Sequence, residues 1–402
     1  MTTPSPHPDA PRLEAGAPGF ARTVALLFFG GFSCFATLYA TQPLLPQLAA
    51  EFGVTPALAS TAVSAGTAAL ALMLIPSAVL SDRIGRKTLM SASLALATLF
   101  ALLSALAPNH TLLVACRMLV GLSLAGLPAV AMTYLREEIG SRSHSLAMGI
   151  YIGGNALGGM AGRVFTAVLA GHFSWRVALA AGAVQTALVA FCFWRFLPDP
   201  RHSVQARHSL RTTLRAAAGH LADPALRRLF AVSFLIMGAF ISLYNYLSFH
   251  LLNPLFRLSA GEIGMVFALY LVGSVASPAS AALSARLGRH RLLWLMIAVM
   301  LLGLAATLPM NLAAVVGGVA VFTFGFFSAH ATAAAWVGRQ ATQHHSLASA
   351  LYLSAYYLGA SLIGTLSGVL WPAFAWHGVA AVIGAALLAA LIAALGLPRR
   401  AP

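Results

Sequence analysis

Long apolar segments separated by short polar connections repeat along almost the whole chain. Each segment has about 20 residues or more, the length that an α-helix needs to cross the hydrocarbon core of a bilayer. One connection, from Pro198 to Arg228, is longer and rich in arginine. The pattern predicts twelve transmembrane helices, at 20–42, 56–80, 88–107, 111–135, 145–169, 177–197, 229–252, 260–283, 291–310, 312–337, 346–370 and 378–397.

The long connection divides the predicted helices into two groups of six. We expect an all-α membrane protein with a six-helix bundle at 20–197, a cytoplasmic linker at 198–228 and a second six-helix bundle at 229–397. The polar, Pro-rich residues 1–19 are expected to form a disordered cytoplasmic N-terminus, and residues 398–402 a short cytoplasmic tail. The arginine spacing of the linker allows a short amphipathic helix at the membrane interface.

Composition supports a membrane setting. Of the 402 residues, 59% are hydrophobic and only 8% are charged, whereas an ordinary soluble domain is about 25% charged. The net charge of +15 does not indicate nucleic-acid binding, because the basic residues lie in short loops and match no groove-reading motif. With both termini in the cytoplasm, all but four of the 24 Lys and Arg residues lie in cytoplasmic segments, as the positive-inside rule predicts.

The sequence offers no catalytic or metal-binding pattern. Its three cysteines, Cys34, Cys116 and Cys192, fall inside apolar segments and lack metal-ligand spacing. A nucleophile elbow and a phosphate-binding loop are also missing from it. We therefore expect a protein that is not an enzyme and that needs neither a metal nor another cofactor.

The two predicted bundles repeat one another in sequence. The tetrapeptide His-Ser-Leu-Ala occurs at 144–147 and again at 345–348, and Trp175 recurs as Trp376 at the same spacing. Two parallel six-helix repeats are typical of a large class of secondary transporters. The loop after the second helix recurs as well, so that Arg83, Gly85 and Arg86 correspond to Arg286, Gly288 and Arg289.

This loop carries a dense charge pattern. Residues 80–87 read Leu-Ser-Asp-Arg-Ile-Gly-Arg-Lys. A tight turn between two spans needs the glycine, the acid can lie at a helix N-terminus of the other bundle, and an arginine can pair with an acid at the end of the fourth helix. The residues concerned are Asp82, Arg83, Gly85, Arg86, Lys87, Glu137 and Glu138.

The segment resembles the loop 2–3 signature of the major facilitator superfamily, G-x-L-A-D-R-x-G-R-K. The resemblance implies the twelve-helix major facilitator fold and a latch that closes the cytoplasmic side in the outward-facing state; topology anchoring alone is the alternative role. Ala78 stands where the family usually has glycine. Ala285 replaces the acid in the second-bundle copy, so only the first copy can form the complete latch.

Two arginines lie inside predicted spans. Arg117 with Gly121 resembles the R-x-x-x-G motif of the superfamily's fourth helix, and Arg163 lies on the fifth helix. A charged side chain at bilayer depth costs about 2.5–3.5 kcal/mol on insertion scales, so each arginine should face a cavity or find partners. Proton coupling or anion contact, and hydrogen bonding to backbone carbonyls, are both open roles for Arg117.

The fifth predicted helix carries a strip of glycines that resembles the superfamily's antiporter motif, which is associated with exporters. Such a strip allows close helix contact and sliding. Glycine replaces the motif's proline here, and tight packing alone stays open as an alternative. The glycines, which we assign to helix packing, are Gly149, Gly153, Gly154, Gly158, Gly159 and Gly162.

Polar-tipped side chains inside the spans are candidates for the wall of a substrate cavity. Packed, hydrogen-bonded core residues are the alternative for each of them. The expected cavity residues in the second bundle are Tyr244, Asn245, His250, His330, Tyr352, Tyr356 and Tyr357. Gln42 and Asn155 of the first bundle are expected to face them.

None of the nine acidic residues lies in the middle of a predicted span. A buried carboxylate, the proton site of many proton-coupled antiporters, is therefore missing. The remaining candidates for proton coupling are the loop acids named above and the histidines His250 and His330, because histidine titrates near neutral pH. Without a membrane acid, Arg117 and Arg163 favour a neutral or anionic substrate.

Several stretches, most closely 149–163 and 237–376, are similar to bacterial inner-membrane proteins grouped with the drug and sugar exporters of the superfamily. The resemblance implies a secondary transporter that works by alternating access, with proton-coupled export of small amphipathic compounds or sugars as the first hypothesis. An uptake permease or facilitator for an anionic or neutral metabolite is the alternative, and a non-transporting receptor is the third. The expected partners of this monomer are a small-molecule substrate, protons and the lipid bilayer, without nucleic acid.

Overall fold

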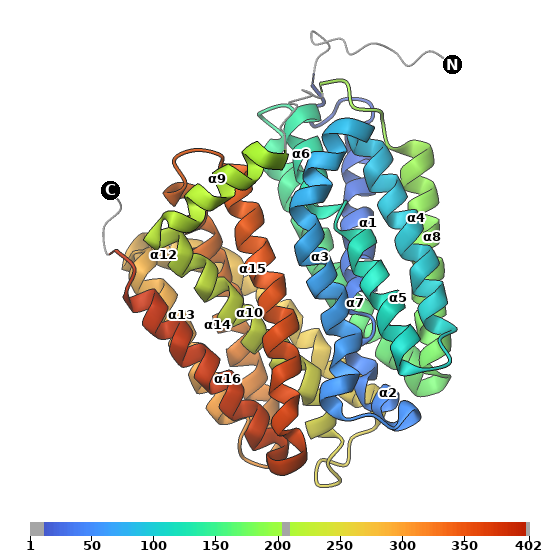
Figure 1. Cartoon of the computed structure of the whole chain (residues 1–402), viewed down its shortest axis with the longest axis vertical. Helices are drawn as coiled ribbons and strands as arrows, with labels where there is room; N and C mark the ends of the chain where they lie inside the picture. The colour runs from blue at the N-terminus through green and yellow to red at the C-terminus, as the bar shows by residue number, and fades with distance from the viewer. Residues whose placement is uncertain (1–11, 203–209, 399–402) are drawn as a thin grey trace.

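The computed structural model describes residues 12–202 and 210–398. Within these two ranges the chain is helical, apart from turns and one isolated parallel bridge between Leu13 and Ile139. Figure 1 shows two groups of long helices side by side, formed by the first and the second half of the described chain. The all-α class that the sequence predicts is confirmed.

The first bundle is coloured blue to green in Figure 1. Its elements are α1 (Phe20–Tyr39), η1 (Gln42–Leu44), α2 (Leu45–Phe52), α3 (Pro56–Ile84), α4 (Arg86–Ala105), α5 (His110–Leu124), α6 (Pro128–Glu138), α7 (His144–His172) and α8 (Trp175–Phe196). Within it α1 packs along α7, α3 along α5, and α4 along α8.

The second bundle repeats this packing. Its elements, with the helix that leads into it, are α9 (Leu210–Ala222), α10 (Pro224–Leu251), α11 (Ala260–Met265), η2 (Val266–Leu271), α12 (Val272–Leu287), α13 (Arg289–Ala306), α14 (Leu312–Gln340), α15 (His345–Leu366), η3 (Ser367–Leu370) and α16 (Trp371–Leu395). Here α10 packs along α15, α12 along α14, and α13 along α16. The internal sequence repeat is therefore also a repeat of helix contacts.

The bundles meet through two pairs of helices. α3 packs along α15, and α7 packs against α11 and η2. The hydroxyl of Thr365 donates to that of Ser64 at 2.7 Å, and the hydroxyl of Ser354 donates to the carbonyl oxygen of Ala71 at 3.1 Å. The middle of the molecule is thus built by helices of both bundles.

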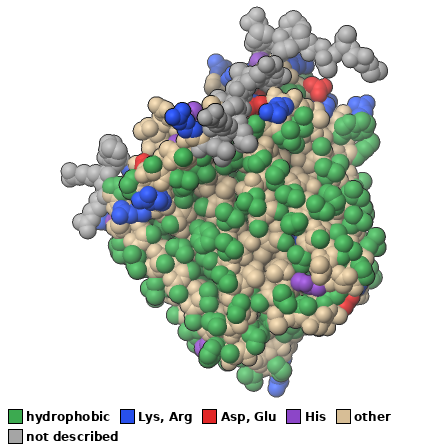
Figure 2. Space-filling view, in the orientation of Figure 1, with side chains coloured by type: hydrophobic (Ala, Val, Ile, Leu, Met, Phe, Trp, Pro, Cys, Tyr) green, Lys and Arg blue, Asp and Glu red, His purple; other side chains and the backbone are tan. Residues whose placement is uncertain are grey.

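Charged side chains gather at one end of the molecule. Figure 2 shows a face that is hydrophobic over its middle, with most of its Lys and Arg side chains near the end where the described chain begins and ends. We call this end, which carries Arg86, Lys87 and Arg289, the basic end, and the end that carries Glu51 and Arg176 the opposite end. An apolar belt between two polar ends suits a bilayer.

Polar residues fix where several helices begin. Thr55, Asn109, Ser174 and Asn311 each accept a hydrogen bond from the backbone N–H three residues further on. Such caps satisfy donors that have no partner inside the helix. Asp223 caps α10 in this way, and Pro224 takes the first helical position, where proline is tolerated. The first long helix of the second bundle therefore begins at 224 and not at the predicted residue 229.

The structure also corrects the prediction for the first residues that it describes. Residues 12–19 were predicted to be disordered, yet the Leu13 N–H donates to the Glu138 carbonyl oxygen and the Gly140 N–H donates to the Leu13 carbonyl oxygen, both at 2.9 Å. These bonds tie the segment to the connection between α6 and α7. The remaining parts of the predicted N-terminus, linker and tail, at 1–11, 203–209 and 399–402, lie outside the described residues.

Nine helices in the described residues are long and apolar enough to cross a membrane. One of these candidates runs over 51 residues, from His345 to Leu395, and has a kink at Ala375, so it is long enough for two spans. The fourth predicted helix is interrupted before Pro128, and α7 is not among the nine. The count of twelve spans stays a prediction.

Candidate functional site

A buried arginine lies where the two bundles meet. Arg163 of α7 is 1% exposed. Its Nε donates to Oε1 of Gln42 at 2.5 Å, and its Nη1 donates to the carbonyl oxygen of Gly159. The guanidinium lies over the rings of Tyr39 and Tyr270, 4.1 and 4.3 Å from their centroids. Both distances suit a cation–π contact.

Gln42 connects this arginine to the second bundle. Its Nε2 donates to Oδ1 of Asn245 on α10 at 2.7 Å. Nδ2 of Asn245 and the hydroxyl of Tyr270 are buried and have no hydrogen-bond partner within the described residues. Because buried polar groups normally find a partner, both groups are available to a bound molecule. We call Tyr39, Gln42, Arg163, Asn245 and Tyr270 the central cluster.

The central cluster lies where two membrane segments leave regular α-helical geometry. α1 ends at Tyr39, and the chain continues into the 3₁₀ turn η1, which begins at Gln42. In the second bundle the 3₁₀ segment η2 separates α11 from α12 and carries Tyr270. A 3₁₀ stretch inside a longer helix often marks a functional hinge. The two irregular segments therefore bring polar side chains from both bundles to Arg163.

Arg117 of α5 supports the end of α1. It is 1% exposed, and its Nη2 donates to the carbonyl oxygens of Thr37, at 2.8 Å, and Leu38. The last carbonyls of a helix lack intrahelical partners and carry partial negative charge, so a cation is stabilised there. Of the two roles left open for Arg117, the structure contains the hydrogen bonds to backbone carbonyls, which hold the turn that follows α1.

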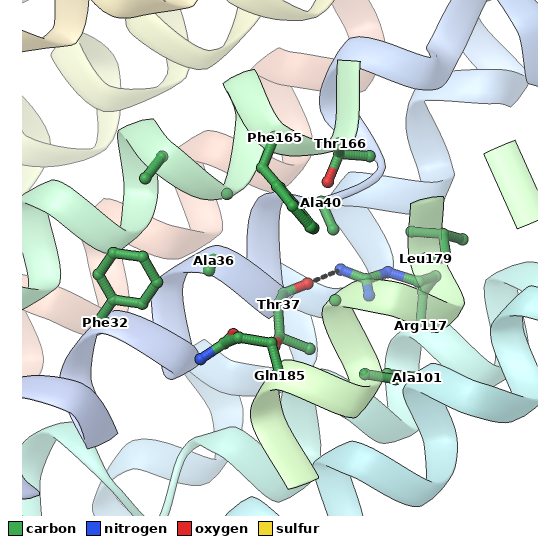
Figure 3. Close-up of a pocket in the computed structure, with 14 residues that line it drawn as sticks. Phe32, Ala36, Thr37, Ala40, Ala101, Arg117, Phe165, Thr166, Leu179 and Gln185 are labelled. Atoms are coloured by element: carbon green, nitrogen blue, oxygen red, sulfur yellow. Dashed lines mark hydrogen bonds between the residues drawn. The ribbon is translucent and has the colours of Figure 1, made fainter. Parts of the chain in front are cut away.

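A small cavity borders Arg117 inside the first bundle (Figure 3). Figure 3 shows its guanidinium beside Thr37, with Phe165 and Gln185 on other sides of the space. The cavity has a volume of about 190 Å³, below the roughly 300–1,000 Å³ that is usual for ligand sites. Its size and largely apolar lining do not suit a whole polar substrate.

Neither buried arginine is neutralised by a carboxylate among the described residues. Each described acid has a partner elsewhere. These partners are Ser143 for Glu14, Arg176 for Glu51, Arg86 for Asp82 and Glu137, His202 for Glu138, Lys87 for Asp199, the start of α10 for Asp223, and Ser259 for Glu262. The central cluster therefore carries an uncompensated positive charge.

Aromatic side chains of the second bundle extend from the central cluster. The rings of Tyr270 and Tyr244 have centroids 4.5 Å apart, and Tyr244 packs further against Phe267 at 5.6 Å. The hydroxyl of Tyr244 shares a hydrogen bond of 2.9 Å with that of Thr323. Tyr244 is thus a packed neighbour of the central cluster with a satisfied polar tip.

A histidine and three tyrosines form a second group beside it. His330 of α14 shares a hydrogen bond of 3.0 Å between its Nδ1 and the hydroxyl of Tyr352. The ring of Tyr356 lies 4.8 Å from that of His330 and 5.1 Å from that of Tyr357. The ring of Phe326 lies 6.0 Å from that of His330, and the ring of Phe240 lies 3.8 Å from that of Phe326 and 5.2 Å from that of Tyr270, which joins this group to the central cluster.

Two predicted cavity residues lie away from the central cluster. His250 stacks on Trp376 with 4.6 Å between ring centroids. It lies away from the central cluster because it is more than one helical turn beyond Asn245 on α10 and on another face of that helix. Asn155 of α7 lies against Gly31 of α1, about two turns from Arg163. It faces its own bundle rather than the second.

Three of the predicted glycines of α7 lie against α1. A Cβ added at Gly154, Gly158 or Gly162 would collide with the backbone of α1. Close contact of this kind is what small residues permit between membrane helices. The strip therefore packs two helices of the same bundle. The other three are Gly149 and Gly153, which border open space, and Gly159, which accepts the hydrogen bond from Arg163.

At the basic end, the loop residues form an ion-pair cluster. Nε and Nη2 of Arg86 donate to the two carboxylate oxygens of Glu137 at 2.5 and 2.6 Å, and Nη1 donates to Asp82 at 3.2 Å and to Ser81 at 3.1 Å. Such a bidentate pair is the strong form of an ion pair. We call Asp82, Arg86 and Glu137 the loop cluster.

The other predicted latch residues surround the loop cluster. Gly85 has φ 90°, a conformation that favours glycine. Lys87 pairs with Asp199 at 3.2 Å, and Glu138 accepts from two backbone N–H groups of the linker. Arg83 is exposed and makes none of the ion pairs in the described part of the chain. In this conformation the loop cluster stays within the first bundle.

A cavity of about 690 Å³ opens between the bundles at the basic end. Asp82, Arg86 and Glu137 line it on one side, and α15 residues from His345 to Leu353 line it on the other. At the opposite end the bundles are in contact through α7 with α11 and α2 with α10. Among the described residues, the interface therefore has a cavity at the basic end and helix contacts at the opposite end.

Sequence reasoning missed the two tyrosines that flank Arg163. Tyr39 precedes Gln42 by one helical turn, so the periodicity of the first span could have grouped the two residues. The position of Tyr270 depends on how the bundles dock, and no local pattern reports that. Of the central cluster, only Gln42, Arg163 and Asn245 were predicted from the sequence.

Two repeats of membrane helices, with a polar cluster between them, are the architecture of a membrane transporter. The family model described as Major Facilitator Superfamily matches residues 27–364, and the chain belongs to this superfamily. It is therefore a transporter and not an enzyme.

The chain is 40% identical over 388 residues to the inner membrane transport protein YnfM of Escherichia coli (strain K12), covering 96% of this chain and 93% of that protein. It is 30% identical over 330 residues to a probable 4-methylmuconolactone transporter of Cupriavidus pinatubonensis (strain JMP 134 / LMG 1197), covering 77% and 76%. A solved bacterial homologue of the human lysosomal transporter Spinster, inward-facing and occupied, matches with a TM-score of 0.81 at 16% identity, covering 94% and 96%. This last likeness shows the fold alone.

Proposed function

We propose that this chain carries small organic monoanions with an unsaturated or aromatic ring across the bacterial inner membrane, together with a proton, by alternating access. One observation carries the proposal: Arg163 is buried between the bundles without a carboxylate partner among the described residues, and it lies against two tyrosine rings. The remaining steps concern the substrate, the conformational cycle and the proton.

An anion suits the central cluster in charge and in hydrogen bonding. A substrate carboxylate would neutralise Arg163 and accept from the free donors Asn245 Nδ2 and Tyr270 hydroxyl. An unsaturated ring would pack on the neighbouring tyrosines. The name of the relative as a 4-methylmuconolactone transporter supports this class, because that compound joins a carboxylic acid to an unsaturated lactone ring. A cationic substrate would meet like charge.

The conformational cycle follows from where the bundles touch. If the basic end lies in the cytoplasm with both termini, as the positive-inside rule predicts, the cavity at that end makes this the inward-facing state of a twelve-span transporter. Rocking of the bundles would close this cavity and open the opposite end. The hydrogen bond between Gln42 and Asn245 spans the bundles at the central cluster, so its rearrangement would accompany the movement.

Uptake of a monoanion requires a compensating positive charge. Moving one negative charge inward against an inside-negative potential costs about 2.3 kcal/mol per 100 mV, and one proton cancels that term. His330, bonded to Tyr352 beside Tyr356, is our candidate proton carrier. The glycine strip gives no argument for export, because three of its members pack within one bundle.

Counterflow in proteoliposomes tests the substrate class. Vesicles loaded with a hydroxybenzoate are diluted into labelled hydroxybenzoate, with an internal pH dye to follow protons. We expect exchange of the carboxylate but not of the matching hydroxybenzamide or hydroxybenzylamine. Arg163→Gln should reduce the exchange about 10- to 100-fold, as expected for the loss of a hydrogen bond to a charged group.

Matched variants make the result decisive. Arg195→Gln removes an exposed arginine from the first bundle and should leave exchange unchanged. Full exchange by Arg163→Gln, or equal exchange of the amide, would exclude the anion site. Proton movement that disappears in His330→Ala and persists in His250→Ala would support the proton carrier; unchanged coupling in both would remove histidine from the mechanism.

A further inference from the structure

The loop at 80–87 recurs after α12, and we call the two copies the basic loops. The second copy keeps the arginine that corresponds to Arg86 but lacks the acids that neutralise Arg86 in the first copy. Arg289 corresponds to Arg86, and Ala285 takes the place of Asp82. At the same spacing, Gln340, the last residue of α14, takes the place of Glu137. Both carboxylates of the loop cluster are therefore replaced by uncharged residues.

The surroundings of Arg289 contain a second arginine and no ion-pair partner within the described residues. Its guanidinium lies over the ring of Trp336, 4.6 Å from the centroid, and Arg339 lies close enough to repel it. The acid that the structure brings to Gln340, the residue after Arg339, is Asp223, which is bonded to Gln340 and to the start of α10. Two like charges are thus left side by side at the basic end.

An indole N–H and the first amides of α13 are further donors near Arg289. Nε1 of Trp336 is buried and has no hydrogen-bond partner within the described residues, and the tryptophan is 1% exposed, although buried indole N–H groups usually find a partner. α13 begins at Arg289, and its N-cap, Gly288, offers no side-chain acceptor to the first amides. The N-terminus of a helix favours an anion.

We propose that Arg289, Arg339 and the start of α13 form a binding site for one phosphate group, which takes the place of the two carboxylates of the loop cluster. A phosphate supplies the negative charge and several acceptor oxygens, and arginine recognises it well. The site lies where the second bundle meets the basic end of the apolar belt. Basic pockets in this position bind anionic lipid headgroups; a soluble phosphate is the other source of the same chemistry.

Native mass spectrometry of the purified full chain in neutral detergent tests the site. The probes are phosphatidylglycerol, phosphatidylcholine and inorganic phosphate. We expect phosphatidylglycerol to bind more tightly than phosphatidylcholine, and Arg289→Gln or Arg339→Gln to weaken it about fivefold each, the effect of one basic residue at an anionic surface. Arg195→Gln, which removes an exposed arginine from the first bundle, should bind as the unchanged chain does.

A reciprocal variant adds charge without removing an arginine. Ala285→Asp rebuilds the acid of the first copy one turn before Arg289 and keeps the bond between Gln340 and Asp223, so it should weaken phosphate binding at least as much as Arg289→Gln does in a folded protein. Competition by inorganic phosphate identifies a soluble phosphate as an occupant, and lipid binding without competition identifies the headgroup. Equal binding of both lipids and no binding of phosphate, or unchanged binding in Arg289→Gln, would overturn the proposal.

Discussion

The two copies of the basic loop place the same arginine in different electrostatic surroundings. Arg86 of the first bundle is 7% exposed and bonded to Glu137 and Asp82. Arg289 of the second bundle is partly exposed, lies on Trp336 and has Arg339 as its charged neighbour. The second copy has the cation but not its counter-charge, so the two bundles are chemically unequal at the same structural position.

The turn is the part that both copies share. Gly85 and Gly288 have φ values of 90° and 76°, and each lies between two long helices that meet at the turn. Left-handed backbone favours glycine whatever the charges nearby. Geometry therefore explains the glycine that both copies share, whereas the charges around the arginine differ between the copies. Three substitutions test this difference.

The largest effect is expected from Glu137→Ala. Removing one partner of a buried ion pair costs about 3–5 kcal/mol, and because Arg86 keeps Asp82 as a second partner, we expect a loss toward the lower end of this range. Thermal unfolding in detergent should show a clear loss of stability. The matched variant Gln340→Ala, which removes no charge from the second copy but one long hydrogen bond to Asp223, should cost less than Glu137→Ala, about 1–2 kcal/mol. Equal losses in the two variants would show that the copies are energetically alike.

A smaller effect, on transport rather than on stability, is expected from Asp82→Asn. Asp82 lines the cavity opposite the start of α15, so closure would bring its charge toward that helix N-terminus, a contact worth up to about 2 kcal/mol. Transport should fall about tenfold while membrane insertion is unchanged. Ala285→Asn at the equivalent position should have no effect on transport, and a normal rate in Asp82→Asn would remove the latch from the mechanism.

The smallest effect is expected from Ala285→Asp alone. The new acid would lie one helical turn before Arg289, in the arrangement that Asp82 has with Arg86. An exposed pair of this type contributes about 0.3–0.5 kcal/mol. Because an acid in the last turn of α12 has a cost of its own, the pair is measured by unfolding Ala285→Asp, Arg289→Gln and the double variant, which should show a coupling of this size at low salt that disappears at high salt. The absence of a coupling would mean that Arg289 is already neutralised in the chain by another group.

Much of the fold could be predicted from the sequence because local rules decide it. Apolar segments define the long helices, and the bonding of Arg86 to Glu137 joins residues that the loop pattern had grouped. Hydropathy placed the start of α10 five residues too late, because hydropathy does not report helix caps such as Asp223 and Pro224, which are ordinary start signals. Hydropathy alone does not identify α9, which is too polar to count as a span, but the arginine spacing of the linker had allowed a short amphipathic helix there.

The central cluster was less predictable because it depends on docking. Arg163 and Gln42 were named as polar residues inside apolar segments, which is a local signal. That Tyr270 lies over Arg163 follows from the contact of η2 with α7 across the two bundles. The prediction that His250 lines the cavity depended on which face of α10 it occupies. Its polarity alone gives no information on that face.

The short segment at residues 12–19 has a practical consequence for reporter fusions. Leu13 is bonded to Glu138 and Gly140, and Ser143 bonds both Glu14 and Ala15. A bulky fluorescent protein joined directly ahead of this segment would pull on the connection between α6 and α7, which follows the loop cluster, and so disturb the part of the molecule under observation. A spacer ahead of residue 12, or a label attached after residue 398, separates the reporter from these bonds.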